Sequence, residues 1–195
     1  MISGHHPSVL CSRLNRLPRA AIYLVALLAA IGGGAGAADT AVQRADQLKA
    51  GYLLNFLKFV EWPDSVPSNL LTVCFIGGNG VRDALASGID TKMAGERHLA
   101  VRTLSDSETP AGCNVLYLDA AMMPPGAHEP NTAESPILTV SDAKAFAHMG
   151  GMIELFSDAN HLRFNINVAS AQKAGLHISS SLLQLAAAVE QATPQ

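Results

Sequence analysis

Two strand-like runs joined by a short polar loop dominate the last third of this 195-residue chain. The runs are residues 152–156 and 161–168, and the loop between them is Ser157-Asp158-Ala159-Asn160. A polar loop of this length is typical of two antiparallel strands that are neighbours in a sheet. The sequence therefore predicts a β-hairpin here, and with it a sheet that contains at least one antiparallel pair.

The side-chain pattern also predicts the register of this hairpin. With Phe156 opposite His161, four apolar side chains share one face of the pair: Ile153, Leu155, Leu162 and Phe164. Glu154 then lies opposite Arg163 on the other face, where opposite charges attract. Hydrophobicity and charge thus favour the same pairing.

Capping residues predict two helices after the hairpin. Asn167 can accept hydrogen bonds from the free amides at the start of a short helix, and Gly175 can adopt the left-handed conformation at its end. Ser181 and Gln184 have the spacing of a capping box ahead of a second, terminal helix. The apolar side chains of this terminal helix are Leu182, Leu185 and Val189.

The preceding residues alternate between helical and strand-like patterns. A helix with one broad apolar face is predicted over 41–60, and Pro63 stops it at Trp62. Predicted strands follow at 70–76, 98–104, 114–118 and 137–140, with short helices at 81–86 and 144–149. We expect an α/β fold: a three-layer sandwich with a mixed, mostly parallel sheet flanked by helices, then the C-terminal hairpin and the terminal helix.

A glycine-rich turn, Gly77-Gly78-Asn79-Gly80, lies between the first of these strands and a short helix. Its position is that of the phosphate-binding turn in dinucleotide-binding domains. However, the third glycine of that fingerprint falls on Asp83, whose negative charge disfavours a pyrophosphate. We interpret the segment as a tight strand-to-helix turn.

The first 38 residues have the parts of an export signal. Three arginines precede an apolar run at 20–31, and small residues at 32–38 offer cleavage sites that leave Ala38 or Asp39 first. An uncleaved anchor is the alternative, although the run is shorter than a membrane span of about 20 residues. We expect a signal peptide over 1–38, a single domain over 39–195 and a periplasmic location.

Charge narrows the possible partners of the exported part. From Asp39 onward, sixteen Asp and Glu residues face ten Lys and Arg residues, and no basic run remains. Nucleic-acid binding needs a basic patch, so this balance argues against it.

Two cysteines, Cys74 and Cys113, remain after the predicted cleavage. Both lie on strand-like segments that can be neighbours in one sheet, and the periplasm permits disulfides. A bond between them closes a loop of about forty residues and stabilises the fold by about 4 kcal/mol on the loop-entropy model. Two buried, unpaired thiols are the alternative.

Motifs for catalysis are missing from the sequence. It has neither a Gly-x-Ser-x-Gly elbow nor a His-Glu-x-x-His pair, and its histidines are scattered. His161 and His177 are the pair most able to share a metal, but no third ligand is evident. Asp119 follows a strand and is a candidate ligand contact, whereas Asp142 with Ser141 is a candidate helix cap. We predict no catalytic residue, cofactor or metal site.

Trp62, the only tryptophan, ends an aromatic-rich helix. It either caps the core beside Phe56 and Phe59 or anchors a partner or ligand. Aromatic side chains suit the second role because they present a large rigid area at little entropic cost.

Several segments together resemble the YfiR family of small periplasmic proteins. In order they are residues 52–63 (Tyr-Leu-Leu-Asn-Phe-Leu-Lys-Phe-Val-Glu-Trp-Pro), 136–142, 150–153, 164–167, 174–176 and 178–183. The resemblance runs from Asp46 to Val189. The best-known members repress an inner-membrane diguanylate cyclase by binding its periplasmic sensor part.

The resemblance implies a non-enzymatic, homodimeric repressor that lowers cyclic-di-GMP and biofilm formation. Its candidate partner-binding residues are Trp62, Arg163, Asn165 and Leu183. The alternative is a periplasmic small-ligand-binding module that serves a histidine kinase or a transport receptor. A hydrolase, which needs a serine beside a histidine, is a third and weaker hypothesis.

Overall fold

The structure, a computed structural model, describes residues 35–67, 69–88, 97–123 and 135–191. The chain divides into two compact units, 1–41 and 42–195, and the sheet belongs to the second. The predicted signal peptide lies outside the described residues except for 35–38, so it stays a prediction. Within the described ranges, no helix combines the length and apolarity needed to cross a membrane.

The described elements follow one another as a helix, a set of strands with short helices between them, and a final strand. They are α2 (Ala35–Phe59), β1 (Val60–Glu61), β2 (Leu70–Ile76), α3 (Asn79–Gly88), β3 (His98–Thr103), β4 (Val115–Leu118), the 3₁₀ turn η1 (Ala120–Met122), β5 (Leu138–Ser141), β6 (Ile153–Asp158), β7 (His161–Asn167), α4 (Val168–Lys173), β8 (His177–Ile178), α5 (Ser180–Leu183) and β9 (Ala188–Glu190).

A seven-stranded sheet in the order β3-β2-β4-β5-β6-β7-β9 forms the centre of the second unit. Its neighbours are parallel except β6 and β7, which are antiparallel. Each of the four strands predicted in the middle of the chain is present, with ends within a residue of the expected ones. The predicted α/β fold with a mixed, mostly parallel sheet is therefore confirmed.

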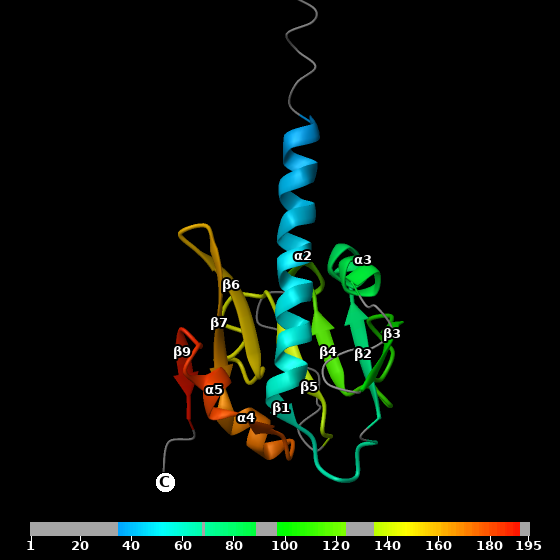
Figure 1. The fold of residues 1–195 in the computed structure, drawn as a ribbon, viewed down its shortest axis with the longest axis vertical. Coiled ribbons are helices and arrows are strands. Elements are labelled where there is room, and N and C mark those ends of the chain that lie inside the picture. The colour runs from blue at the N-terminus through cyan, green and yellow to red at the C-terminus, as the bar shows by residue number, and fades with distance from the viewer. Residues whose placement is uncertain (1–34, 68, 89–96, 124–134, 192–195) are drawn as a thin grey trace, which may run out of the picture. The chain divides into compact units, whose positions relative to one another are not determined.

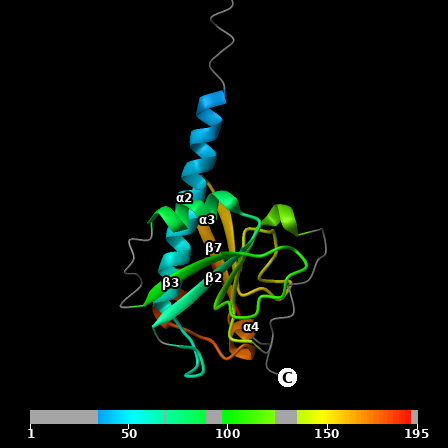
Figure 2. The same cartoon turned by 90° about the vertical axis from the view of Figure 1, so that its right-hand side faces the viewer.

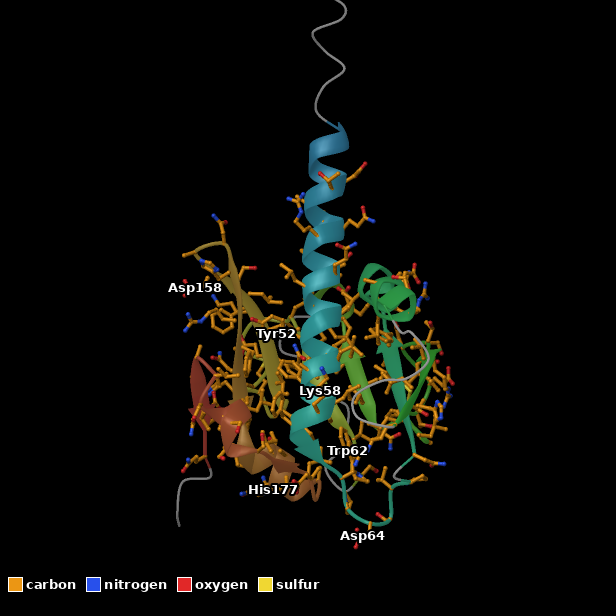
Figure 3. The ribbon with its side chains drawn as sticks, viewed as in Figure 1. Tyr52, Lys58, Trp62, Asp64, Asp158 and His177 are labelled. Carbon is orange, nitrogen blue, oxygen red and sulfur yellow. A yellow bond between two sulfur atoms is a disulfide. The ribbon has the colours of Figure 1, made fainter. Side chains whose placement is uncertain are left out.

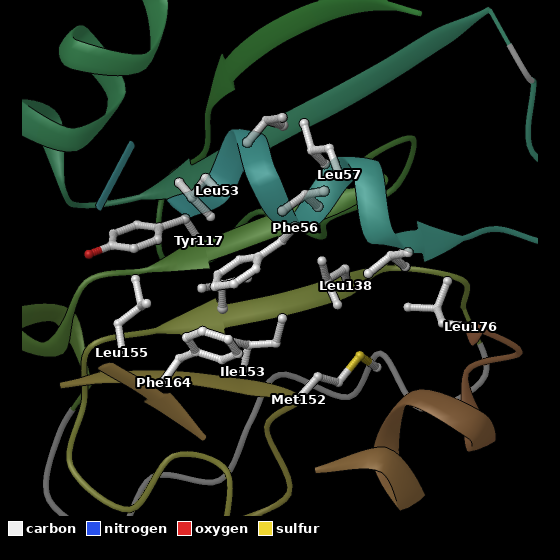
Figure 4. Close-up of a cluster of buried hydrophobic side chains, with 14 of the residues drawn as sticks. Leu53, Phe56, Leu57, Tyr117, Leu138, Met152, Ile153, Leu155, Phe164 and Leu176 are labelled. Atoms are coloured by element: carbon white, nitrogen blue, oxygen red, sulfur yellow. The ribbon is translucent and has the colours of Figure 1, made fainter. Parts of the chain in front are cut away.

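The C-terminal half of helix α2 packs along one face of this sheet (Figures 1 and 2). Its buried side chains meet those of the strands in one large apolar cluster (Figure 4). Tyr52, Phe56 and Phe164 form a triangle of edge-to-face rings with centroids 5.2–6.0 Å apart, the arrangement that aromatic quadrupoles favour. The tyrosine hydroxyl also donates to the carbonyl oxygen of Leu162 at 2.9 Å, which ties the helix to β7.

A second apolar cluster covers the other face of the sheet. It contains Cys74, Ile76, Leu104, Cys113, Leu116, Leu118, Ile137, Ala143 and Phe146. Cys74 and Cys113 are joined in the predicted disulfide, with their Cα atoms 5.9 Å apart. Cys74 lies on β2, and Cys113 comes two residues before β4, the parallel neighbour of β2.

The segment 144–149, predicted as a helix, forms a series of turns instead. Ala145 has φ 62°, outside the helical region, and so interrupts any regular helix there. The carboxylate of Glu154 accepts hydrogen bonds from the amides of Ala145 and Ala147 at 3.0 and 3.4 Å. The side chain of Glu154 on β6 therefore accepts hydrogen bonds from backbone amides that a regular helix would pair with its own carbonyl groups.

The hairpin is present, but its predicted register is wrong by two residues. Phe156 pairs with Arg163 and Asp158 with His161, so Glu154 lies opposite Asn165 and the expected ion pair does not form. The turn consists of two residues, Ala159 and Asn160, with φ 45° and 65°. Positive φ at both positions is characteristic of the type I′ hairpin turn, which matches the twist of the strands.

A shift of two residues leaves every side chain on its predicted face, because strand side chains alternate with a period of two. Leu155 and Phe164 indeed pair directly on the side that faces α2. The face assignment is therefore confirmed, although the partners differ.

The structure confirms the predicted helix caps of the C-terminal segment only in part. Asn167 caps α4 as predicted, accepting from the amide of Ser170 at 2.9 Å, and Gly175 has φ 72°. The terminal helix is a single turn, α5, which begins two positions earlier than expected because Ser179, and not Ser181, is its cap. The chain then continues into β9, which pairs with β7 and is the last described element.

Candidate functional site

The loop that follows α2 is set by a small second sheet. Helix α2 ends at Phe59, and Val60 and Glu61 pair with Ile178 and His177 of β8. This two-stranded sheet fixes the direction in which the chain leaves the helix. Trp62 and Pro63 come directly after it.

Trp62 is half-buried and packs against the large apolar cluster. Its indole Nε1 donates to the carbonyl oxygen of Asn114 at 3.3 Å, and the side-chain oxygen of Asn114 accepts from the amide of Thr72 at 2.8 Å. The guanidinium of Arg97 lies 5.8 Å from the centre of the indole ring, within cation–π range. The indole is thus held from both sides in one orientation.

An open groove, which we call the Trp62 groove, lies against this indole. Its cavity volume is about 430 Å³, and its lining residues are Trp62, Pro63, Asp64, Val66, Pro67 and Arg97. A second depression of about 440 Å³ shares Val66 and Pro67 and extends to Gly112 and Ile137. A rigid aromatic side chain beside an arginine is typical of the residues that dominate protein–protein binding energy.

The other predicted contact residues lie elsewhere. Arg163 is exposed and Asn165 half-buried on the face of β7 opposite to Phe164, because strand side chains alternate. Leu183 packs against the large apolar cluster from α5. Trp62 packs against the same cluster as Leu183, on the side of the sheet that α2 covers. Arg163 and Asn165 lie on the other side, so the four residues do not form a single surface.

A second group of polar side chains gathers where β4 and β5 end. Asp142, predicted as a helix cap, accepts from the amide of Ala120 at 2.9 Å and forms an ion pair with Lys49 of α2. Ser141 is the local cap instead, because its Oγ accepts from the amide of Ala143 at 3.0 Å. The Lys49–Asp142 pair therefore ties α2 to the carboxyl end of β5.

Asp119 caps η1, with Oδ1 accepting from the amide of Ala121 at 2.8 Å. Gly77 and Gly78 have φ 69° and 61°, so the tight turn predicted after β2 is confirmed. A Cβ atom added at Gly78 would lie 2.7 Å from the ring of Tyr117. Glycine is needed at this position because the turn passes directly over the ring.

Tyr117 lies beneath this turn and is completely buried. Its hydroxyl group makes no hydrogen bond with any described residue. Burial, and then the carboxylates of Asp142, Asp119 and Asp46, raises the pKa of this hydroxyl far above its ordinary range. The sequence gives no sign of this cluster, because Asp46, Lys49 and Tyr117 come together only through the packing of α2 on the sheet.

Comparison with known protein families assigns the chain to one of them. The family described as YfiR/HmsC-like matches residues 46–187, which is most of the chain. The protein belongs to the YfiR/HmsC-like family. The predicted resemblance, from Asp46 to Val189, is thereby confirmed.

Membership in the YfiR/HmsC-like family implies a periplasmic regulator of diguanylate cyclase, in a family that is regulatory rather than catalytic. The family-typical segment 52–63 forms the buried half of α2, strand β1 and one wall of the Trp62 groove. Over the described ranges, no three His, Cys, Asp or Glu side chains are grouped as a metal site. His161 and His177, the pair considered for a metal, lie on β7 and β8.

Proposed function

We propose that this protein represses an inner-membrane diguanylate cyclase by binding the cyclase's periplasmic sensor domain. Cyclic-di-GMP production then falls, and biofilm formation with it. The observation that carries this proposal is the family match over residues 46–187. The groove at Trp62 supports it, because it offers a binding surface that needs no reactive group.

Repression follows from a population shift. A regulator that binds the inactive arrangement of the sensor more tightly than the active one moves cyclase molecules toward the inactive state. A change from mostly active to mostly inactive needs a difference in binding free energy of about 5 kcal/mol. A standard protein–protein interface, burying about 1,600 Å², can supply it.

We assign the cyclase contact to the Trp62 groove. Trp62 and Arg97 present an oriented aromatic ring and a guanidinium, while Pro63 and Pro67 keep the loop stiff. Arg163 and Asn165 face the other side of the sheet, so a single partner surface does not reach both regions. The proposed homodimer, which needs a surface of its own, uses the face that carries Arg163 and Asn165.

Charge reversal at the groove tests this assignment. Asp64 is exposed in the groove, whereas Asp158 is exposed at the hairpin, far from Asp64 in the view of Figure 3. Deleting the gene should raise cellular cyclic-di-GMP, and wild-type protein or Asp158→Lys should restore the low level. Asp64→Lys should fail to restore it and should no longer co-purify with the cyclase from solubilised envelope.

Two results contradict the proposal. Unchanged cyclic-di-GMP after deletion, in a strain with an intact cyclase, removes the repressor function. Full repression by Asp64→Lys, with the protein present at wild-type level, removes the groove from the interface.

A further inference from the structure

The Trp62 groove holds two opposite charges that do not pair with each other. Its charged lining residues are Asp64, which is exposed, and Arg97, which is half-buried, and the others are apolar or aromatic. In the described part of the chain, no carboxylate forms an ion pair with Arg97, and no cation forms one with Asp64. The guanidinium is thus partly removed from water without a carboxylate to compensate its charge.

The guanidinium of Arg97 is also held in place. It lies 5.8 Å from the centre of the Trp62 ring, and the hydrogen bond from the indole to the carbonyl oxygen of Asn114, at 3.3 Å, fixes that ring in turn. Pro63 and Pro67 restrict the backbone of the loop beside it. A cation–π contact uses no N–H donor, so the donors of this guanidinium stay available to a partner.

We propose that the Trp62 groove recognises a segment of the cyclase's periplasmic sensor domain that carries one acidic and one basic side chain. The acidic side chain pairs with Arg97, and the basic one pairs with Asp64. This inference rests on the function proposed above, because it names the groups on the cyclase that enter the groove. It makes Arg97 the residue that determines which segment is accepted.

The chemistry of the guanidinium favours a carboxylate as its partner. Its N–H donors form a rigid fork that matches the two oxygens of a carboxylate, so Arg97 can donate two parallel hydrogen bonds to one acidic side chain. The apolar side chains of Val66 and Pro67, which line the same groove, suit the carbon chain that carries the carboxylate. Pairing of opposite charges across an interface also gives specificity, because a segment with the charges reversed is repelled at both positions.

The second charge of the groove disfavours the other common partner of an arginine, an anionic lipid surface. Such a surface presents many phosphate groups, and Asp64 repels those that do not reach Arg97. From Asp39 onward the chain has sixteen acidic and ten basic residues, a net charge of −6, which adds to this repulsion. A protein segment with both charges satisfies the two groove residues together.

Charge-swap complementation tests the pairing in a strain that lacks the chromosomal gene. Arg97→Glu should leave cyclic-di-GMP at the level of the deletion strain, and Arg97→Gln should weaken co-purification with the cyclase about tenfold. Each Asp and Glu of the sensor domain is then changed to Lys, one at a time. We expect one of these cyclase variants to escape the wild-type protein and to be repressed by Arg97→Glu, but not by Asp64→Lys.

Arg44→Glu is the matched control. Arg44 is exposed on α2, and roughly 20 Å of helix separate it from Phe59, where the helix ends ahead of the groove. This control should repress like the wild type. The substitutions at Arg97 should keep the fold, because Trp62 remains packed against the core and bonded to Asn114; melting temperatures of the purified variants measure this.

Three results would overturn the pairing. They are full repression by Arg97→Glu at wild-type protein level, the absence of any lysine variant of the cyclase that Arg97→Glu represses, and binding to phosphatidylglycerol vesicles that depends on Arg97. The first of these, in a strain where deletion raises cyclic-di-GMP, removes the pairing and leaves the proposed function intact. Unchanged cyclic-di-GMP after deletion removes the proposed function, and this inference with it.

Discussion

At the scale of single residues, Tyr117 is an exception in an otherwise satisfied core. Other buried polar side chains have partners: Glu154 accepts from two amides, and Asn167 caps α4 while donating to the carbonyl of Ala147 at 2.8 Å. The hydroxyl of Tyr117 has none among the described residues. A buried polar group without a hydrogen-bond partner lowers the stability of the folded protein, and a substitution that removes the group can recover that stability.

Tyr117→Phe should therefore stabilise the protein by about 1 kcal/mol, because it removes a desolvated hydroxyl and keeps the ring. Urea denaturation of the variant and the wild type measures the difference. Tyr52→Phe is the matched control, since the hydroxyl of Tyr52 does donate to Leu162. The control should lose about 1 kcal/mol, and a loss of the same size in both variants would contradict this account of Tyr117.

The same hydroxyl predicts a pH dependence. Its pKa is raised in the folded state, so the unfolded chain loses the proton first, near the ordinary tyrosine pKa of 10.0. The free energy of unfolding should be unaffected below that pH and fall above it, by up to about 1.4 kcal/mol per pH unit. Tyr117→Phe should lack this part of the alkaline loss, as denaturation at pH 9 to 11 would reveal.

At the scale of elements, the turn of the hairpin decides the register. The sequence predicted a four-residue loop, since Ser157 to Asn160 are all polar or small. The structure extends β6 by two residues, to Asp158, whereas β7 begins at His161 as predicted, and the turn consists of Ala159 and Asn160. Longer pairing satisfies more backbone groups, and this outweighs the cost of placing an alanine at positive φ.

Ala159→Gly should stabilise the hairpin by about 1 kcal/mol, because glycine adopts φ 45° without steric cost. Thermal unfolding followed by circular dichroism measures the change. Ala187→Gly is a suitable comparison in a segment without positive φ, and it should not stabilise the protein. Equal stabilisation by both substitutions would argue against strain at position 159.

The other elements differ in how far local pattern decides them. The cap at Asn167 and the left-handed glycine at 175 were predictable, because a cap acts within a few residues of itself. The end of the chain was not predictable, because the pattern of residues 184–190 indicates a helix. In the structure an unpaired edge of β7 lies beside this segment and favours a strand. The amide of Ala187 donates to the carbonyl of Phe164 at 2.8 Å, and β9 forms along that edge.

At the scale of the whole molecule, the disulfide joins two parallel neighbours of the central sheet. Cys74 and Cys113 lie 39 positions apart in the sequence, and α3 and β3 lie between them. Closing a loop of that length restricts the unfolded chain more than the folded one. The bond therefore stabilises the folded unit that contains the central sheet.

The double variant Cys74→Ala/Cys113→Ala should lose about 4 kcal/mol of unfolding free energy on the loop-entropy model. Guanidinium denaturation with and without dithiothreitol measures it. Reductant should lower the stability of the wild type by a similar amount and leave the double variant unchanged. An effect of reductant on the double variant, or none on the wild type, would show that the bond does not contribute in this way.

The candidate site residues differ in whether the sequence alone could identify them. Trp62 was identifiable from the sequence because it is the only tryptophan and ends a long apolar helix, yet Arg97 beside it was not, since 34 residues separate the two. Arg163, Asn165 and Leu183 remain predicted contacts. Their placement on different surfaces came only with the structure.

The sequence alone determined the strands β2 to β7 of the sheet, the side of each hairpin residue, the caps of α4 and the family, because periodicity and capping depend on neighbours along the chain. The tertiary structure alone decided the hairpin register, the strand β9, the Lys49–Asp142 pair and the isolated hydroxyl of Tyr117. The strand β9 and the Lys49–Asp142 pair result from satisfying backbone groups or charges across elements that are distant in sequence. No local pattern contains that information, since the partner is chosen by the packing of α2 and the order of the strands.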